Sequence, residues 1–267
     1  MKPIAQTNIQ LYNQLSELDY DTSQIRLVAD AYELGTTIYV GLYRGSGKTL
    51  IAHVVGTASI LATCGRPAEV VAAGVLHAAY ADGDFGRRDP ATIVTRRCGR
   101  QVHELVAGYD ELSWSYESGM VEELTKRAAS LSKFDREVVI MRVANELEDY
   151  VDLATHYHGD STPSDAKKGA EWRLAYMEDV EEPLVELSNE LGRADLADEI
   201  RQRFAEVRHA AVETSLRTGR TSMWFQPPAS YRRTLGGLLR LLSRRVRKAR
   251  AMGVLAVIAA LRRRLAG

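Results

Sequence analysis

The sequence predicts an all-α protein, and three observations lead to this prediction. Apolar residues recur every three or four positions along most of the 267 residues, which is the period of one face of an α-helix. Ala, Leu, Val, Glu and Arg dominate, most of them good helix formers, and only seven residues are proline. Hydrophobic residues make up 45% of the chain, which is enough apolar material for a core.

Each expected helix is marked by apolar residues at helical spacing. The segment 68–79 is apolar on almost every side, as a helix buried in a core would be. Pro183 is expected to interrupt the segment 166–191, because proline lacks the backbone N–H that a helix interior needs. A loop is expected at 83–90. The expected helices are residues 25–34, 51–61, 68–79, 102–112, 121–131, 135–153, 166–191 and 195–218.

Three regions are predicted along the chain. Residues 1–155 form a helical bundle, residues 156–218 a charged helical extension, and residues 219–267 a linker followed by a basic amphipathic tail. Polar, Pro-containing stretches at 158–165 and 218–230 are expected to be linkers. Residues 231–267 hold eleven Lys or Arg and no Asp or Glu, although the whole chain has a net charge of zero. An acidic body therefore precedes a basic tail.

The basic tail has several candidate partners. A basic amphipathic helix binds an anionic membrane surface or an acidic partner, and it can also fold back on its own acidic body or join a homodimer. Nucleic acid ranks last, because the tail lacks interleaved aromatic residues for stacking on bases. The apolar run at 252–261 is too short to span a bilayer, and two cysteines indicate a reducing compartment. A cytoplasmic protein, peripheral at the membrane if the tail binds lipid, is expected.

The segment 44–53 allows two interpretations. Gly45, Ser46, Gly47, Lys48 and Thr49 match the second half of a phosphate-binding loop, with residues 38–40 as the strand before it. The motif also needs a glycine earlier in the loop, where the chain has leucine, and no later strand ends in a magnesium-binding aspartate. An NTP-binding protein of this kind is the weakest alternative.

The second interpretation uses several segments in order. Residues 44–53 contain Arg44, Ser46 and His53, and His77 follows at the end of the expected buried helix; residues 100–112 and 135–149 come next. This order and spacing resemble the hydrolase domain of the RelA/SpoT-type alarmone enzymes, a branch of the HD phosphohydrolase superfamily. The resemblance covers about half of the chain and implies an HD-domain-like helical bundle that acts on a nucleotide or another phosphorylated small molecule.

The resemblance also implies a divalent metal, manganese or iron, that activates water. Two histidine ligands of the family fall on His53 and His77. The aspartate that follows the second histidine falls on Ala78, and the distant aspartate falls on Asn145. Two neutral imidazoles and an amide bind a hard cation poorly, so the metal site is expected to be incomplete. Asp82, Asp84, Glu148 or Asp149 are candidates for a replacement carboxylate.

Other family positions give the remaining candidate site residues. Of the acidic pair that orients water, only Asp82 is present, and it is the candidate catalytic residue. Arg44, Ser46 and Lys48 are expected to hold an anionic ligand, and Asp149 stands where the family has an asparagine that recognises nucleotide. His103 and the residues 156–158 are expected at the surface.

Two main hypotheses follow. The chain is either a phosphohydrolase with a remodelled metal site, or a catalytically inactive pseudo-enzyme that keeps the fold for binding or regulation.

Overall fold

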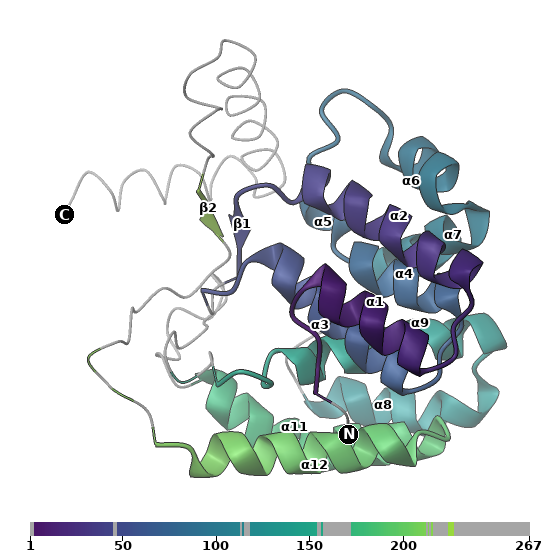
Figure 1. The fold of residues 1–267 in the computed structure, drawn as a ribbon. Coiled ribbons are helices and arrows are strands. Elements are labelled where there is room, and N and C mark those ends of the chain that lie inside the picture. The colour runs from purple at the N-terminus through teal and green to yellow at the C-terminus, as the bar shows by residue number, and fades with distance from the viewer. Residues whose placement is uncertain are drawn as a thin grey trace, which may run out of the picture.

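The all-α prediction is confirmed by the computed structural model, which describes residues 3–44, 47–112, 114, 118–153, 156, 172–211, 213, 215 and 224–226. Helices form nearly all of its regular structure (Figure 1). In chain order the elements are α1 (Asn8–Glu17), α2 (Thr22–Ile38), β1 (Leu42–Tyr43), α3 (Leu50–Thr63), α4 (Ala68–Leu76), α5 (Ala79–Asp82), α6 (Pro90–Cys98), α7 (Arg100–Glu111), α8 (Ser118–Arg127), the 3-10 helix η1 (Ala128–Ser130), α9 (Lys133–Glu148), α11 (Trp172–Glu190), α12 (Ala194–His209) and β2 (Trp224–Phe225).

Helices α3 and α4 form the centre of the bundle. Helix α4 packs against α2, α3 and α7, and α3 packs against α4 and α9. Every residue of α4 except Glu69 is buried, as the apolar segment 68–79 predicts. Both helices therefore lie inside the bundle, and a polar side chain on either of them needs a partner from a neighbouring helix.

Helices α11 and α12 pack side by side along one end of the bundle (Figure 1). Helix α11 also contacts α8, and its buried residues belong to the same apolar cluster as those of α3 and α4. The predicted interruption at Pro183 is wrong, because α11 continues through it. Val180, Leu184 and Leu187 keep helical spacing and are fully buried, and this packing outweighs the missing hydrogen bond of the proline.

Several predicted boundaries shift. The segment 68–79 breaks at His77 and Ala78, between α4 and α5, and α9 ends at Glu148 although the helix was expected to reach residue 153. Helices α1 and α6 were not predicted. Both start at recognisable caps: the Thr7 hydroxyl accepts a hydrogen bond from the backbone of Gln10, and Asp89 caps a helix that begins with Pro90.

A short antiparallel pairing joins two distant parts of the chain. Strand β1 pairs with β2, with Leu42 opposite Phe225 and Tyr43 opposite Trp224. The segment 218–230, expected to be a linker, thus contributes a strand. The strand expected at residues 38–40 for a phosphate-binding loop is wrong, since Ile38 ends α2. The basic tail and residues 157–171 lie outside the described residues.

The loop after β1 returns on itself before α3 begins. Tyr43 forms a β-bridge with Thr49, and the Arg44 amide donates to the Lys48 carbonyl at 2.8 Å. This turn brings Arg44 and Lys48 to the same place at the start of α3. Within the described ranges, no helix combines the length and apolarity needed to cross a membrane.

Candidate functional site

Helices α3, α4 and α9 bring the predicted site residues together. His53 lies in the first turn of α3, His77 caps the C-terminus of α4, and Asn145 lies in the last turn of α9. All three side chains are at most 4% exposed. Because α3 packs against both α4 and α9, residues from three parts of the sequence converge in one buried polar centre.

The imidazole of His53 is held at both ring nitrogens. Its Nε2 lies 2.7 Å from Oδ1 of Asn145, and its Nδ1 makes a short hydrogen bond with Oε2 of Glu148. The amide and the carboxylate therefore face opposite edges of the ring. His53 has no ring nitrogen left for a ligand in this arrangement.

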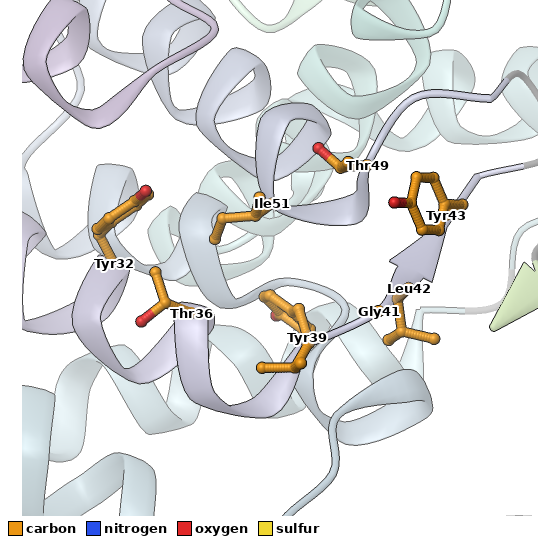
Figure 2. A pocket seen from close by; sticks show the side chains of 9 residues that line it. Tyr32, Thr36, Tyr39, Gly41, Leu42, Tyr43, Thr49 and Ile51 are labelled. Carbon is orange, nitrogen blue, oxygen red and sulfur yellow. The ribbon is translucent and has the colours of Figure 1, made fainter. Parts of the chain in front are cut away.

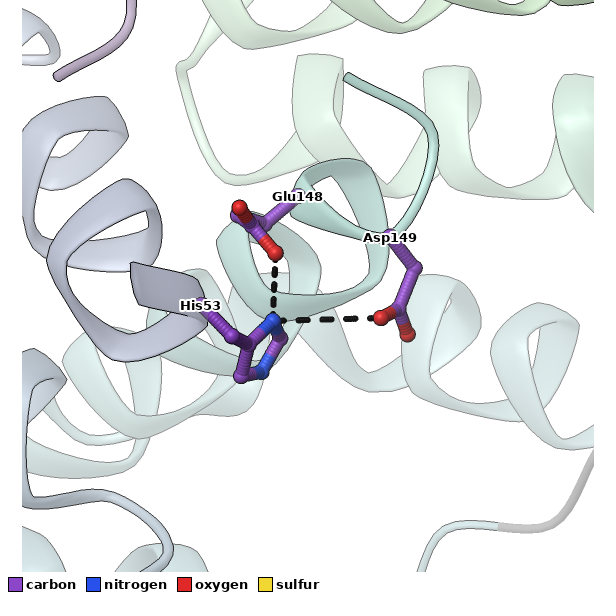
Figure 3. A group of neighbouring side chains, drawn as sticks. All are labelled: His53, Glu148 and Asp149. Atoms are coloured by element: carbon purple, nitrogen blue, oxygen red, sulfur yellow. Dashed lines mark hydrogen bonds and ion pairs between the residues drawn. The ribbon is translucent and has the colours of Figure 1, made fainter. Parts of the chain in front are cut away.

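Two cationic side chains complete the centre. Nζ of Lys48 lies 2.6 Å from Oε1 of Glu148 and 2.8 Å from Oδ2 of Asp152. The guanidinium of Arg44 contacts both carboxylate oxygens of Asp149. Figure 3 shows the carboxylates of Glu148 and Asp149 turned toward Nδ1 of His53. Both carboxylates are thus engaged by side chains of the α3 loop.

Burial controls the protonation of this centre. Burial lowers the pKa of His53 well below 6.5, and the positive charge of Arg44 lowers it further. Burial also raises the pKa of Glu148 above its usual range, and the Lys48 ammonium beside it acts in the opposite direction. Burial acts to lower the pKa of Lys48, but the carboxylates of Glu148 and Asp152 outweigh it and raise that pKa. The His53 imidazole is therefore neutral at pH 7 and the Lys48 ammonium is charged.

His77 extends the polar centre toward α7. Its Nδ1 donates to the Gly74 carbonyl at 2.8 Å, and its ring centroid lies 5.3 Å from that of His53 and 5.0 Å from that of Tyr109. The Tyr109 hydroxyl accepts a hydrogen bond from Arg142 at 2.9 Å. Arg142 also pairs with the buried Glu146 and lies over the Trp114 ring. Next to His77, the Arg142 guanidinium is thus already bonded to both Tyr109 and Glu146.

We expect acid to destabilise the fold through His77. Burial lowers the pKa of His77 well below 6.5, so the unfolded chain binds more protons below that pH. The stabilisation is complete above pH 6.5 and is lost as the pH falls toward the lowered pKa, by about 1.4 kcal/mol per pH unit. The raised pKa of Glu148 acts in the opposite direction over the same window and offsets the similar contribution of His53.

Denaturant unfolding of the wild type and of His77→Gln between pH 5 and 6.5 tests this expectation. The variant should show a flatter dependence of stability on pH. An unchanged slope would mean that His77 is not the buried neutral group.

The remaining sequence candidates have varied placements. Asp82 is the last residue of α5, half-buried, and its charge acts on Tyr39. Ser46 lies outside the described residues. His103, expected at the surface, is half-buried, and its Nδ1 is hydrogen-bonded to the Tyr80 hydroxyl at 2.6 Å. The roles assigned to these residues stay predictions.

A shallow cavity of about 170 Å³ lies elsewhere, beside β1 (Figure 2). Tyr32 and Thr36 of α2, Leu42 and Tyr43 of β1, and Ile51 of α3 are among its lining residues. Its lining is mostly apolar and includes none of the histidines or carboxylates of the polar centre. The cavity therefore does not coincide with the site that the sequence indicates.

The residues present do not fit the metal that the resemblance implies. Such a metal would need Nε2 of His53 and Oδ1 of Asn145 as ligands, and these two atoms are hydrogen-bonded to each other. The position after His77 is an alanine, and the nearby carboxylates of Glu148 and Asp149 face the opposite edge of the His53 ring. A hard divalent cation at the family position would have no carboxylate ligand from these residues.

Two curated relatives are GTP pyrophosphokinases, from Streptomyces coelicolor and Streptomyces antibioticus. Each is 29% identical over 129 residues, which is 48% of this chain and only 15% of the relative. The similarity therefore concerns one part of a much longer protein. A solved structure of a metazoan SpoT ortholog, described as hydrolysing ppGpp and playing a role in starvation responses, is 18% identical and covers 69% of this chain and 97% of its own, with a TM-score of 0.45.

The sequence profile of the HD domain matches residues 31–215. This range begins within α2 and ends after α12, so it contains His53, His77, Asn145 and the helices from α3 to α12, while α1 and the first part of α2 precede it. With well over half of its length matched, the chain belongs to the HD domain family.

Proposed function

We propose that this HD-domain protein binds a nucleotide or another phosphorylated small molecule without hydrolysing it by the metal-dependent route. One observation carries the proposal. The buried carboxylates of Glu148 and Asp149 are already paired with Lys48, Arg44 and His53, while Asn145 bonds to Nε2 of His53. Metal-activated water requires ligands that the polar centre instead uses for internal ion pairs.

The similarity to GTP pyrophosphokinases supports a guanine nucleotide as the ligand. Arg44 is the candidate phosphate-binding residue, because its side chain is 17% exposed and that of Lys48 only 8%. A guanidinium binds phosphate through two parallel hydrogen bonds, as it binds the Asp149 carboxylate. A phosphate would therefore exchange with Asp149 on Arg44.

A second candidate is a phosphohydrolase whose metal site has been rebuilt. His53, Glu148 and Asp149 each offer a ligand atom, and these atoms lie within 4.8 Å of one another. These three metal ligands differ from those that the family resemblance implies, because two carboxylates at the end of α9 take the place of His77 and the distant aspartate. Lys48 and Arg44 argue against a bound divalent cation, because they contact the same carboxylates and their positive charges would repel the metal.

Three measurements on the purified protein separate the two candidates. Metal content is determined by mass spectrometry, binding of GTP and ppGpp by calorimetry with and without manganese, and release of phosphate or pyrophosphate by a coupled assay. We expect little metal, nucleotide binding that does not need manganese, and no release. Arg44→Gln should weaken binding roughly tenfold or more, because a charge-assisted hydrogen bond is lost, and the exposed Lys126→Met is the control.

A stoichiometric metal, lost in His53→Ala and accompanied by metal-dependent release, would instead support the rebuilt phosphohydrolase. Binding that is unaffected by Arg44→Gln would remove Arg44 from the ligand site.

A further inference from the structure

We propose that His53, Glu148 and Asp149 form a latent metal site, in which Lys48 and Arg44 take the place of the cation. The site is distinct from the family position, because it lies at the Nδ1 edge of His53 and does not use His77. Its ligand class is a divalent ion that accepts one imidazole nitrogen and two carboxylate oxygens, for which zinc is the best match. The inference rests on the proposed function in one respect: in both, the carboxylates of the native chain are paired with Lys48 and Arg44 and not with a metal.

The geometry of the three ligand groups carries the first step. Nδ1 of His53 lies within hydrogen-bond reach of Glu148 and 3.8 Å from Oδ1 of Asp149. Ligand atoms around a tetrahedral zinc, each about 2.0–2.2 Å from the metal, lie roughly 3.3 Å apart. To reach that spacing, Nδ1 of His53 and Oε2 of Glu148 must move apart, and by more than Nδ1 and Oδ1 of Asp149 must approach each other. Both movements are small side-chain adjustments at the end of α9.

Asn145 supplies the second step. When the Nδ1 of a histidine binds a metal, its Nε2 carries the proton and is usually held by an oxygen acceptor. Oδ1 of Asn145 lies 2.7 Å from this Nε2 and is buried with it. The asparagine that breaks the family ligand set is therefore a suitable outer partner for a metal on the other edge of the ring.

The charges carry the third step. Glu148 and Asp149 bring two negative charges into a buried region, and such charges require compensation. Lys48 and Arg44 supply two positive charges, which equal the charge of one divalent ion. Lys48 holds Glu148, and also Asp152, while Arg44 holds Asp149, so both cations must be removed before Glu148 and Asp149 can both turn to a metal. The native chain is thus expected to bind zinc weakly at this site.

Replacing both cations by methionine tests the inference. Methionine keeps the length and apolar stem of the side chain but removes its charge. We expect Arg44→Met combined with Lys48→Met to bind about one zinc per chain, with an affinity on the order of 100-fold higher than that of the native chain. Zinc should also raise its thermal midpoint, because a ligand that binds only the folded state stabilises it.

Matched variants identify the site. Adding His53→Phe to the double variant should abolish the gained binding, because phenylalanine keeps a ring but has no ligand nitrogen. Adding His77→Gln should leave it unchanged, and this result separates the proposed site from the family position. Lys126→Met, which removes an exposed positive charge, should gain no zinc.

The readouts are the zinc-to-protein ratio after dialysis and the shift of the thermal midpoint with zinc. If the double variant does not fold alone, refolding that depends on zinc supports the inference. Lys48→Met by itself provides a second test, with a smaller gain in zinc affinity, because it frees Glu148 while Arg44 still holds Asp149. Equal zinc binding by the native chain and both variants would overturn the latent site and leave the proposed function intact. Stoichiometric metal in the native chain would contradict the cation-paired centre itself.

Discussion

Lys48→Met is expected to lower the free energy of unfolding by about 3–5 kcal/mol in the absence of metal. The Lys48 ammonium lies between Glu148 and Asp152, and its side chain is only 8% exposed. Its removal leaves the fully buried Glu148 with His53 and the more distant Gln6 amide, 3.5 Å from Oε1, as its partners among the described residues. Urea unfolding of the native chain and the variant at pH 7, with a chelator present, measures the difference.

A double-mutant cycle shows whether this cost comes from the ion pair. Glu148→Gln removes the charge of the partner, and the amide can still bond to His53. If Lys48 acts through Glu148, the two changes together should cost less than the sum of the single changes, with a coupling energy of roughly 1–3 kcal/mol. Additive costs would show that Lys48 stabilises the fold by packing or through Asp152 alone. The exposed Lys126→Met should change stability by less than about 0.5 kcal/mol.

The sequence predicted the fold better than the ends of its elements. Apolar spacing located the helices that form the bundle, because burial of one face is encoded residue by residue. It missed α1, whose main signal is the Thr7 and Gln10 capping box, and α6, whose signal is the Asp89 cap before Pro90. The sequence also led to a wrong prediction of a break at Pro183 in α11, because the tertiary packing that stabilises this helix is not visible in the local sequence.

The site shows a different limit of sequence reasoning. Spacing and resemblance brought His53, His77 and Asn145 together, and the structure places all three in one buried centre. They could not show that Asn145 would bond to the histidine itself. Which edge of an imidazole faces which partner depends on how α3 and α9 pack, and this is a property of three-dimensional contacts.

The sequence also could not predict the ion pairs that Arg44 and Lys48 form with carboxylates. Both were expected to hold an anionic ligand, yet the structure joins them to carboxylates about a hundred residues later in the chain. Charged residues in the sequence reveal their sign but not their partners. The useful signal was present in the acidic run at the end of α9, where Glu148, Asp149 and Asp152 follow within five residues.

Gly56→Ala is expected to destabilise the fold by about 1–3 kcal/mol through overpacking, with a further loss if Glu148 is displaced. In a helix interior this substitution normally stabilises by about 1 kcal/mol. Here the added Cβ would lie 2.4 Å from Oε1 and 2.7 Å from Cγ of Glu148, which is far inside van der Waals contact. The opposite sign is therefore a direct test of where the carboxylate lies. Urea unfolding of the variant at pH 7 provides the measurement.

Gly35→Ala in α2 is the matched control, because its added Cβ would meet Ile51 at 3.3 Å, a contact that a flexible side chain can relieve. If Gly56→Ala proved as stable as Gly35→Ala, the Glu148 carboxylate could not occupy the space against α3. The absence of a side chain at Gly56, one turn after His53, allows α9 to approach α3 closely enough for Glu148 to reach both His53 and Lys48. A glycine in a strongly helical segment thus has a structural reason that helix propensity alone would not suggest: it makes room for the buried charge on which the whole centre depends.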